Sequence, residues 1–426
     1  PLAATSEPQR PAVMEKRAPA SRSEGQLRAT APSFVGPLDY VKIPPRSMGP
    51  MYSRHNHDPG LTVCDNGDIL VIWYTCEEEP GTEVGSAVSR LKLGATEWEA
   101  AAPFWDVPER NDHGPAIWND GRGTLFHFVG NKQLPGSILR TSRDHGVTWS
   151  PARKFSASTQ VNEAILRKRN GEVLVTLDGV AVTLVEASAD NGETWVSYSD
   201  PTARPTLVPG EKGPAIAGIH AGLVELKDGR LLAFGRFDQA PNQKAFSHTL
   251  PRSVSTDGGR TWHYSVSVFP EISSTQRLTL KRLKEGPLLL CSFTDIPVLK
   301  NIEGLTSGVK PMKDRQGLRF PDGRGGEVKG VGLFAALSFD DGETWPVRRL
   351  ITPGGEARPQ ITIDGKTFDM SDTVAEPSGY LAMDQDPAGT IHLISSRNYY
   401  AFNLAWLLEK SPASAKGAAK AGASPR

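Results

Sequence analysis

One eight-residue pattern, Ser-x-Asp-x-Gly-x-Thr-Trp, occurs four times in this chain of 426 residues. The copies are Ser142-Arg-Asp-His-Gly-Val-Thr-Trp149, Ser188-Ala-Asp-Asn-Gly-Glu-Thr-Trp195, Ser255-Thr-Asp-Gly-Gly-Arg-Thr-Trp262 and Ser338-Phe-Asp-Asp-Gly-Glu-Thr-Trp345. In each copy the aspartate can accept hydrogen bonds from the turn backbone, the glycine can adopt a positive φ, and the tryptophan can anchor the turn between sheets. A tight turn that recurs in this way indicates a repeated structural unit.

A second repeat lies out of phase with the first and consists of a Gly-rich hairpin turn followed by a short apolar strand. It occurs six times, starting near Cys64, Asn119, Lys168, Leu226, Leu283 and Pro387. Each of the first five copies is followed by the eight-residue turn or, after the first copy, by a degenerate form of it. This form, Ser89 to Trp98, has lost the aspartate but keeps a Thr-x-Trp ending. The pattern predicts an all-β protein, a six-bladed β-propeller with four antiparallel strands in each blade.

The repeats define the expected domain limits. We expect disordered tails at 1–36, which lacks an apolar core, and at 410–426, a low-complexity stretch of Ala, Ser and Lys. Between them we expect a propeller over 37–409 with an insertion at 296–330 in blade five. Residues that could form an apolar signal core are missing from the first thirty, and we expect that a signal peptide has been removed from a secreted or periplasmic protein.

Composition narrows the class of partner. Lysine plus arginine and aspartate plus glutamate both number 48, so the global charge gives no reason to expect nucleic acid as a partner. No apolar run approaches the length of a membrane span. The three cysteines are an odd number and predict buried thiols rather than a disulfide framework.

Antiparallel blades place the starts of the first strands and the ends of the second strands on the face opposite the repeated turns, where we expect the functional site. Counting from each turn glycine to these positions gives polar or ionisable residues at nearly every blade: Asp58, His113, Asn162, His220, Arg277 and Tyr380 at the starts, and Tyr74, Asp178, Arg236 and Arg397 at the ends. A ring of such residues converging on one axis predicts a ligand site, because buried polar groups are costly unless they have partners.

The repeated turns and hairpins resemble the sialidase superfamily of Asp-box, or BNR-repeat, propellers over about residues 38–408. The resemblance implies a site with arginines that bind the carboxylate of an acidic sugar and a tyrosine nucleophile. Arg236 resembles one of those arginines, whereas His220 stands where the family has a glutamate, and His57-Asp58-Pro59 replaces an Arg-Ile-Pro motif. Glu376-Pro-Ser-Gly-Tyr380 resembles the region of the nucleophile. The loop at 76–83 offers glutamates where the family has an acid/base aspartate.

The sequence therefore predicts a sialidase-like glycoside hydrolase acting on terminal units of an acidic oligosaccharide or polysaccharide, without cofactor or metal. The expected catalytic residues are Tyr380, Glu376, His220, His113, Asp58 and His57, and the expected substrate-binding residues are Arg54, Arg236, Arg277, Arg397, Asn162, Tyr74 and Asp178.

Three alternatives stay open. Histidine, tyrosine and arginine also suit β-elimination, so a polysaccharide lyase or rhamnose–glucuronate enzyme is the second hypothesis. A non-catalytic carbohydrate-binding propeller, with Trp73, Tyr74, Trp105 and Tyr399 stacking on sugars, is the third. A divalent metal among the histidines and Asp58 lacks the usual ligand spacing.

Overall fold

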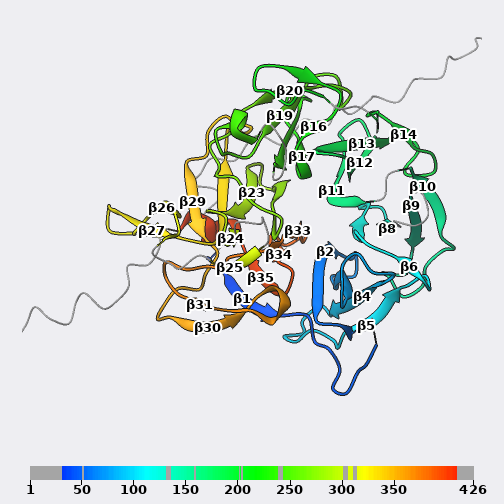
Figure 1. Cartoon of the computed structure of the whole chain (residues 1–426), viewed down its shortest axis with the longest axis horizontal. Coiled ribbons are helices and arrows are strands. Elements are labelled where there is room, and N and C mark those ends of the chain that lie inside the picture. The colour runs from blue at the N-terminus through cyan, green and yellow to red at the C-terminus, as the bar shows by residue number, and fades with distance from the viewer. Residues whose placement is uncertain are drawn as a thin grey trace, which may run out of the picture.

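The computed structural model describes residues 31–49, 52–130, 136–157, 160–200, 202, 205–237, 243–300, 306–309 and 314–409. Six small antiparallel sheets are arranged as blades around a common centre, and the predicted six-bladed β-propeller is confirmed (Figure 1). Of the two predicted tails, residues 1–30 of 1–36 and all of 410–426 lie outside the described residues.

The first five blades each follow the chain from the centre outward. The strands of blades 1 to 5 are β2 (His55–Val63), β3 (Ile69–Cys76), β4 (Glu83–Leu91) and β5 (Ala102–Trp105); β7 (Ala116–Asn119), β8 (Leu125–Gly130), β9 (Ser137–Ser142) and β10 (Arg153–Ser156); β11 (Val161–Arg167), β12 (Val173–Asp178), β13 (Val182–Ser188) and β14 (Val196–Ser197); β17 (Ile219–Glu225), β18 (Leu231–Arg236), β19 (Arg252–Ser255) and β20 (Trp262–Ser265); and β22 (Thr279–Arg282), β23 (Leu288–Phe293), β28 (Leu333–Ser338) and β29 (Val347–Leu350).

Short strands extend three of these blades at their edges. Beside β4 lies β6 (Arg110–Asn111), beside β20 lies β15 (Lys212–Gly213), and beside β13 lies β16 (Ile216–Ala217).

The sixth blade joins the two ends of the domain. Its inner strands are β33 (Ala382–Gln385), β34 (Ile391–Ile394) and β35 (Asn398–Phe402), and its outer strand is β1 (Phe34–Asp39) from the start of the chain. This strand begins at Phe34, within the stretch 1–36 that the sequence analysis assigned to the tail. The segment after β35 forms the short helix α2 (Leu404–Leu408), whose residues are all buried. Pairing of β1 with β35 closes the ring and removes an open sheet edge.

The innermost strands form a ring of contacts in the order β2, β7, β11, β17, β22, β33 and back to β2. They line a central cavity of about 350 Å³ that runs between the blades. Strand β11 supplies a continuous stretch of this lining, from Asn162 to Arg167.

The repeated turns have the geometry that the sequence predicts. In the first of them the Asp144 carboxylate accepts hydrogen bonds from the Thr148 amide at 2.9 Å and the Thr148 hydroxyl at 2.5 Å. Gly146 has a φ of 81°, and the Trp149 indole donates to its carbonyl at 3.3 Å. A Cβ on Gly146 would come within 2.8 Å of Leu70 in blade 1, so the turn also fixes the spacing between neighbouring blades.

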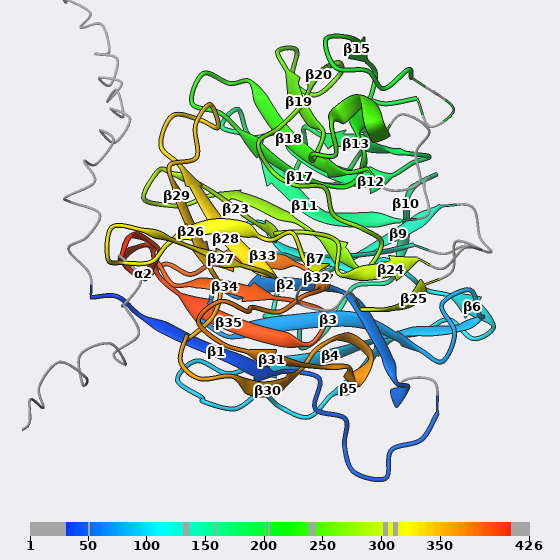
Figure 2. The same cartoon turned by 60° about the vertical axis from the view of Figure 1, so that its left-hand side comes forward.

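Two excursions leave the regular blades, and the second contacts the strand that carries His57 and Asp58. Between β23 and β28 the chain forms the hairpins β24 (Val298–Lys300) with β25 (Thr306–Val309) and β26 (Leu318–Pro321) with β27 (Glu327–Gly330). Figure 2 shows β24 and β25 at the end of the molecule away from α2. Between blades five and six, β30 (Arg358–Ile361) and β31 (Thr367–Met370) form a hairpin around the 3₁₀ turn η4 (Ile363–Gly365), which contacts β2.

Candidate functional site

Backbone irregularities at equivalent places in the repeat aim two side chains of the site. Asp58 has a φ of 50° and lies where the β2–β3 register shifts, between His57 and Gly60. His220 has a φ of 52° and lies at the corresponding shift between β17 and β18. Residues other than glycine seldom adopt this conformation, and bulges of this kind re-aim side chains next to functional sites. The fold therefore holds both side chains in directions that a regular strand would not give them.

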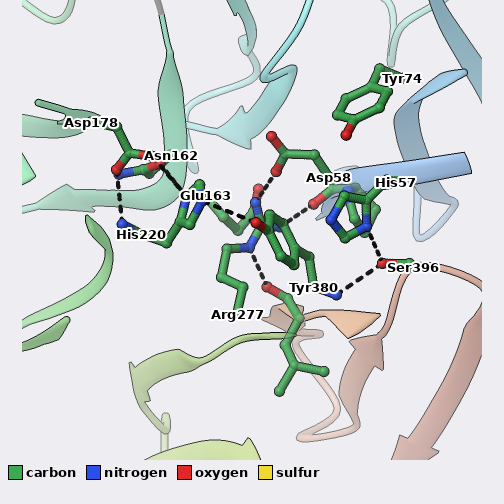
Figure 3. A network of polar contacts seen from close by, with 12 residues as sticks. His57, Asp58, Tyr74, Asn162, Glu163, Asp178, His220, Arg277, Tyr380 and Ser396 are labelled. Atoms are coloured by element: carbon green, nitrogen blue, oxygen red, sulfur yellow. Dashed lines mark hydrogen bonds and ion pairs between the residues drawn. The ribbon is translucent and has the colours of Figure 1, made fainter. Parts of the chain in front are cut away.

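A chain of polar contacts connects blades three, four and six. The Asp178 carboxylate lies 2.9 Å from Nδ1 of His220, and Nε2 of His220 lies 3.2 Å from the Tyr380 hydroxyl. Arg236 donates to the same hydroxyl at 2.7 Å. Figure 3 shows Asp178, Asn162 and His220 grouped together, with Tyr380 facing them from the other side of the site. Asp178, His220 and Tyr380 thus form a continuous path from a carboxylate to a phenol, and Arg236 contacts the phenol end.

The hydrogen bonds determine which nitrogen of His220 carries its proton. Nδ1 faces two acceptors, the Asp178 carboxylate and the Asn162 side-chain oxygen at 3.2 Å, while the Asn162 amide donates to Asp178 at 2.7 Å. Burial alone would raise the pKa of Asp178, but the charge and hydrogen bonds of His220 together lower it. In its neutral form the imidazole would therefore carry its proton on Nδ1 and present the lone pair of Nε2 to Tyr380.

The Tyr380 hydroxyl keeps its proton at neutral pH and lies beside both acceptors and a cation. Burial raises the pKa of Tyr380 to about 12, and the positive charge of Arg236 acts in the opposite direction. The hydroxyl faces two acceptors, Nε2 of His220 and the Ser274 carbonyl at 3.1 Å. A phenolate formed here would be stabilised by the Arg236 guanidinium.

A short parallel pairing places an arginine next to this tyrosine. In it, β21 (Gln276–Arg277) lies beside β32 (Gly379–Tyr380), with Arg277 opposite Tyr380. Arg277 is 2% exposed and donates to Asp58 and to the carbonyls of Pro59 and Leu381. Burial raises the pKa of Asp58 against the opposing charge of Arg277. Oδ2 of Asp58 has no hydrogen-bond partner, so this carboxylate is held through its other oxygen.

Aromatic rings from blade one form the wall beside Tyr380. The His57 ring lies 3.9 Å from the Tyr380 ring, centroid to centroid, and its Nδ1 contacts the Ser396 hydroxyl at 2.7 Å. Burial lowers the pKa of His57 well below its ordinary value, so the ring is neutral. Tyr74 packs against both His57 and His113, with centroid separations of 5.9 and 5.8 Å.

Glu376 occupies a different environment from Tyr380. One of its carboxylate oxygens accepts from Thr362, Ser395 and Asn398 and the other from Tyr400, at 2.7 to 2.9 Å. Burial raises its pKa to about 7 despite these donors. The structure thus places His220, rather than Glu376, in contact with the Tyr380 hydroxyl.

Two arginines expected in the site lie apart from these contacts. Arg54 has 81% of its side chain exposed and lies 3.7 Å from Glu77. Arg397 binds the Asp39 carboxylate at 2.7 Å, on the outer strand of blade six. The structure brings together the other sequence-predicted residues around Tyr380: His57, Asp58, Tyr74, His113, Asn162, Asp178, His220, Arg236 and Arg277.

Three further residues of the site stand outside the predicted catalytic and substrate-binding sets. Glu163 follows Asn162 on β11 and points into the central cavity, and burial raises its pKa to about 8. Its Oε2 has no hydrogen-bond partner. His55 and Asp364 form a pair at 2.6 Å between β2 and η4. The place of Glu163 directly after the predicted residue Asn162 could have indicated it, whereas no sequence pattern connects Asp364 with His55.

The described part of the chain was compared with the requirements for a metal site and for a membrane-spanning helix. Among the residues that the structure describes, no group of three or more His, Cys, Asp or Glu side chains is placed to hold a metal ion. In that same part of the chain, no helix has the length and apolar character needed to span a bilayer. All three cysteines are buried free thiols.

Comparison with known families agrees with the fold. Residues 67–393 match the model of the BNR repeat-like domain, and the chain belongs to this family. The family is that of Asp-box propellers, the superfamily that includes the sialidases. A search by sequence among curated proteins finds no match.

Solved structures share the architecture at low sequence identity. A Dyadobacter fermentans protein of unknown function is 13% identical, with a TM-score of 0.53 over 86% of this chain and 98% of that one. The intramolecular trans-sialidase from Ruminococcus gnavus is 12% identical, with a TM-score of 0.53 over 84% and 96%. The Hadza microbial sialidase Hz136 is 16% identical, with a TM-score of 0.51 over 82% and 66%. At these identities the likeness shows the fold alone.

Proposed function

We propose that the protein is a glycoside hydrolase that cleaves terminal units of an acidic glycan with Tyr380 as its nucleophile. The observation that carries the proposal is the chain from Asp178 through His220 to the Tyr380 hydroxyl, with Arg236 on the same oxygen. It has the logic of a nucleophile, a base and a group that orients the base. Secretion or export to the periplasm is part of the proposal, because glycan substrates of this type lie outside the cytoplasm.

In this mechanism His220 is the base for Tyr380. As the phenol oxygen attacks the anomeric carbon, its proton moves to Nε2 of His220, and the imidazolium is stabilised by Asp178. A base is needed because the pKa of Tyr380, about 12, leaves little phenolate at neutral pH. A neutral phenol also avoids the repulsion between a carboxylate nucleophile and an anionic sugar, since sialidases are an exception to the two-carboxylate rule.

Substrate binding is assigned to Arg236. Its guanidinium lies beside the reacting oxygen, so a carboxylate attached to the anomeric carbon of the substrate would lie close to it. The other buried arginine, Arg277, donates with all three of its guanidinium nitrogens, to Leu381, Asp58 and Pro59, and is assigned to holding Asp58 and the β21–β32 pairing. The proposal therefore uses one arginine for the substrate carboxylate where the family resemblance implies three.

A lyase is the second candidate, and the same contacts favour it. A histidine and a tyrosine joined by a hydrogen bond, next to an arginine, could remove the proton beside a uronate carboxylate and protonate the leaving oxygen. The two reactions differ in their products, because hydrolysis adds water and elimination leaves a carbon–carbon double bond.

The test is to incubate the protein with a panel of sialosides and uronic-acid oligosaccharides in heavy-oxygen water. Hydrolysis predicts released sugar that carries the heavy oxygen and shows no new ultraviolet absorbance. Unlabelled product with the absorbance of an unsaturated uronate would establish the lyase instead. Binding without turnover of any member of the panel would contradict both and leave a carbohydrate-binding propeller.

A further inference from the structure

A second Asp–His–Tyr series lies at the opening of the site, next to the first. Asp364, in η4, lies 2.6 Å from Nδ1 of His55 at the start of β2. Nε2 of His55 lies 3.4 Å from the Tyr74 hydroxyl on β3. The hairpin between blades five and six therefore reaches across to blade one and holds a histidine there.

His55 differs from the other histidines of the site in its exposure. His57, His113 and His220 are 4 to 5% exposed, whereas 22% of the His55 side chain is open to solvent. The His55 ring lies 5.5 Å from the His57 ring, which in turn lies 3.9 Å from the Tyr380 ring. A sugar that placed its anomeric carbon at Tyr380 could thus present its leaving oxygen to His55.

The contacts leave one nitrogen of His55 available for proton exchange. Burial would raise the pKa of Asp364, but the hydrogen bonds and charges of His55 and Lys366 together lower it, so the carboxylate is ionised and holds the Nδ1 proton. Burial keeps the pKa of Tyr74 well above its ordinary value, so this phenol stays protonated. Nε2 faces Tyr74 across a long contact and can exchange this partner for a substrate oxygen.

We propose that His55 is the acid/base residue that protonates the leaving oxygen, and that Asp364 is its positioning residue. The inference rests on the proposed function and completes it, because a nucleophile alone leaves an alkoxide to depart without a proton. It moves the acid/base role from the glutamates of the loop at 76–83 to a histidine held by a distant hairpin.

The two steps balance in bonds and protons. The first step begins with His55 as the imidazolium. Tyr380 bonds to the anomeric carbon, and the glycosidic bond breaks with its electron pair on the leaving oxygen. This oxygen takes the Nε2 proton of His55, which leaves a neutral imidazole with its proton on Nδ1, while His220 takes the Tyr380 proton. In the second, water bonds to the anomeric carbon and gives a proton to His55, the bond to Tyr380 breaks, and His220 returns its proton to the phenolate. The sum is glycoside plus water giving free sugar plus alcohol.

The experiment compares two substrates that differ in their need for an acid: sialyllactose, whose leaving group must be protonated, and the 4-methylumbelliferyl glycoside of the same sugar, whose leaving group departs as an anion. For His55→Gln we expect kcat/KM on sialyllactose to fall by roughly 10²- to 10⁴-fold, the usual contribution of general acid catalysis, with a much smaller loss on the aryl glycoside. Asp364→Asn is also expected to lower kcat/KM more on sialyllactose than on the aryl glycoside, but by a smaller factor than His55→Gln. His248→Gln is the matched control, because His248 pairs with Glu271 at 3.1 Å and is 62% exposed.

The outcomes separate the inference from the proposed function. Equal losses on both substrates, or none, in folded His55→Gln would overturn the acid/base role of His55 while leaving Tyr380 in place. Full activity of Tyr380→Phe, or no turnover of any glycoside of the panel by the wild-type protein, would overturn the proposed function and this inference with it. Melting temperatures of all variants identify any loss that comes from unfolding.

Discussion

The Asp178 carboxylate lies 2.9 Å from Nδ1 of His220, which places a buried anion behind a buried imidazole. Asp178 ends the second strand of blade three, and His220 lies at a bulge at the start of blade four. Their contact therefore depends on the radial arrangement of neighbouring blades. It orients the imidazole toward Tyr380, and its removal tests whether orientation matters for the reaction.

Asp178→Asn is expected to lower kcat by roughly 10²- to 10⁴-fold, because the amide can donate to Nδ1 and favour the tautomer that carries its proton on Nε2. The fold should survive, since Asn162 and the His220 amide keep partners of similar shape. Steady-state kinetics together with the imidazole nitrogen NMR shifts of His220 check both points. An unchanged kcat with a changed tautomer would remove His220 from the mechanism.

Tyr380→Phe is expected to abolish turnover of every glycoside tested. The free energy of unfolding should fall by only about 0.5–1.5 kcal/mol, the usual net value of one hydrogen bond. The loss is limited because Arg236 still donates a hydrogen bond to the Gln276 carbonyl at 2.9 Å. Tyr264→Phe is the matched control: its hydroxyl is also buried and donates to the Ala215 carbonyl at 2.8 Å, away from the site. Loss of activity in the control as well would mean that the assay reports stability.

The two buried arginines should respond differently to substitution. Arg277→Met leaves the buried Asp58 carboxylate without its charge partner and should cost about 3–5 kcal/mol of unfolding free energy. Arg236→Met should cost less stability and more activity, because the Arg236 guanidinium contacts the reacting hydroxyl. Urea unfolding and kinetics on the same samples provide the comparison. Adding Asp58→Asn to Arg277→Met should restore part of the stability, and no restoration would argue against a charge pair.

Much of the fold and part of the site follow from local sequence. The turn pattern and the Gly-rich hairpins set the number of blades, and their spacing gives the strand ends at which His220, Asp178 and Asn162 meet. This works because each blade repeats the same order of strands, so a position counted from a turn glycine has the same height in every blade.

Other features depend on contacts that no local pattern encodes. Strand β1 completes blade six through pairing between residues more than 350 positions apart, for which a short apolar stretch near Phe34 gives no signal. Asp364 meets His55 only because the hairpin between blades five and six folds over blade one. Arg277 lies at a position that the sequence predicts, but its hydrogen bonds to Asp58, Pro59 and Leu381 depend on where two other segments of the chain lie.

Glu163 should make the protein less stable as pH rises. Burial raises its folded-state pKa from 4.5 to about 8, so between these values the folded protein binds more protons than the unfolded chain. Stability is then highest at the acidic end of this window and declines by at most about 1.4 kcal/mol per pH unit for one group. Glu163→Gln should flatten that decline in urea unfolding measured from pH 5 to 8.

Glu97→Gln is the control for this pH dependence, because 83% of the Glu97 side chain is exposed. Burial also raises the pKa of Glu376, to about 7, so this residue adds a decline of stability with pH of the same sign. That smaller decline should remain in the Glu163→Gln variant. An identical pH slope in wild type and Glu163→Gln would contradict a protonated carboxyl in the central cavity.

The repeated turns offer a substitution that should affect stability and spare the site. The Asp190 carboxylate accepts from Thr194 and from the Ser188 hydroxyl, and these hydrogen bonds lower its pKa to about 2. Because this value lies below the ordinary 3.8, the stabilisation is present above about pH 4 and is lost as pH falls toward 2. Asp190→Ala should therefore lower the melting temperature near neutral pH, while Glu193→Ala, which removes the same charge from the same turn, should not.

The difference in melting temperature between the Asp190→Ala and Glu193→Ala variants should narrow in acid. Their kcat/KM should match that of the wild-type protein, since the turn lies on the face opposite Tyr380. A loss of activity in folded Asp190→Ala would contradict this separation of a turn face that holds the blades from a face that carries the chemistry.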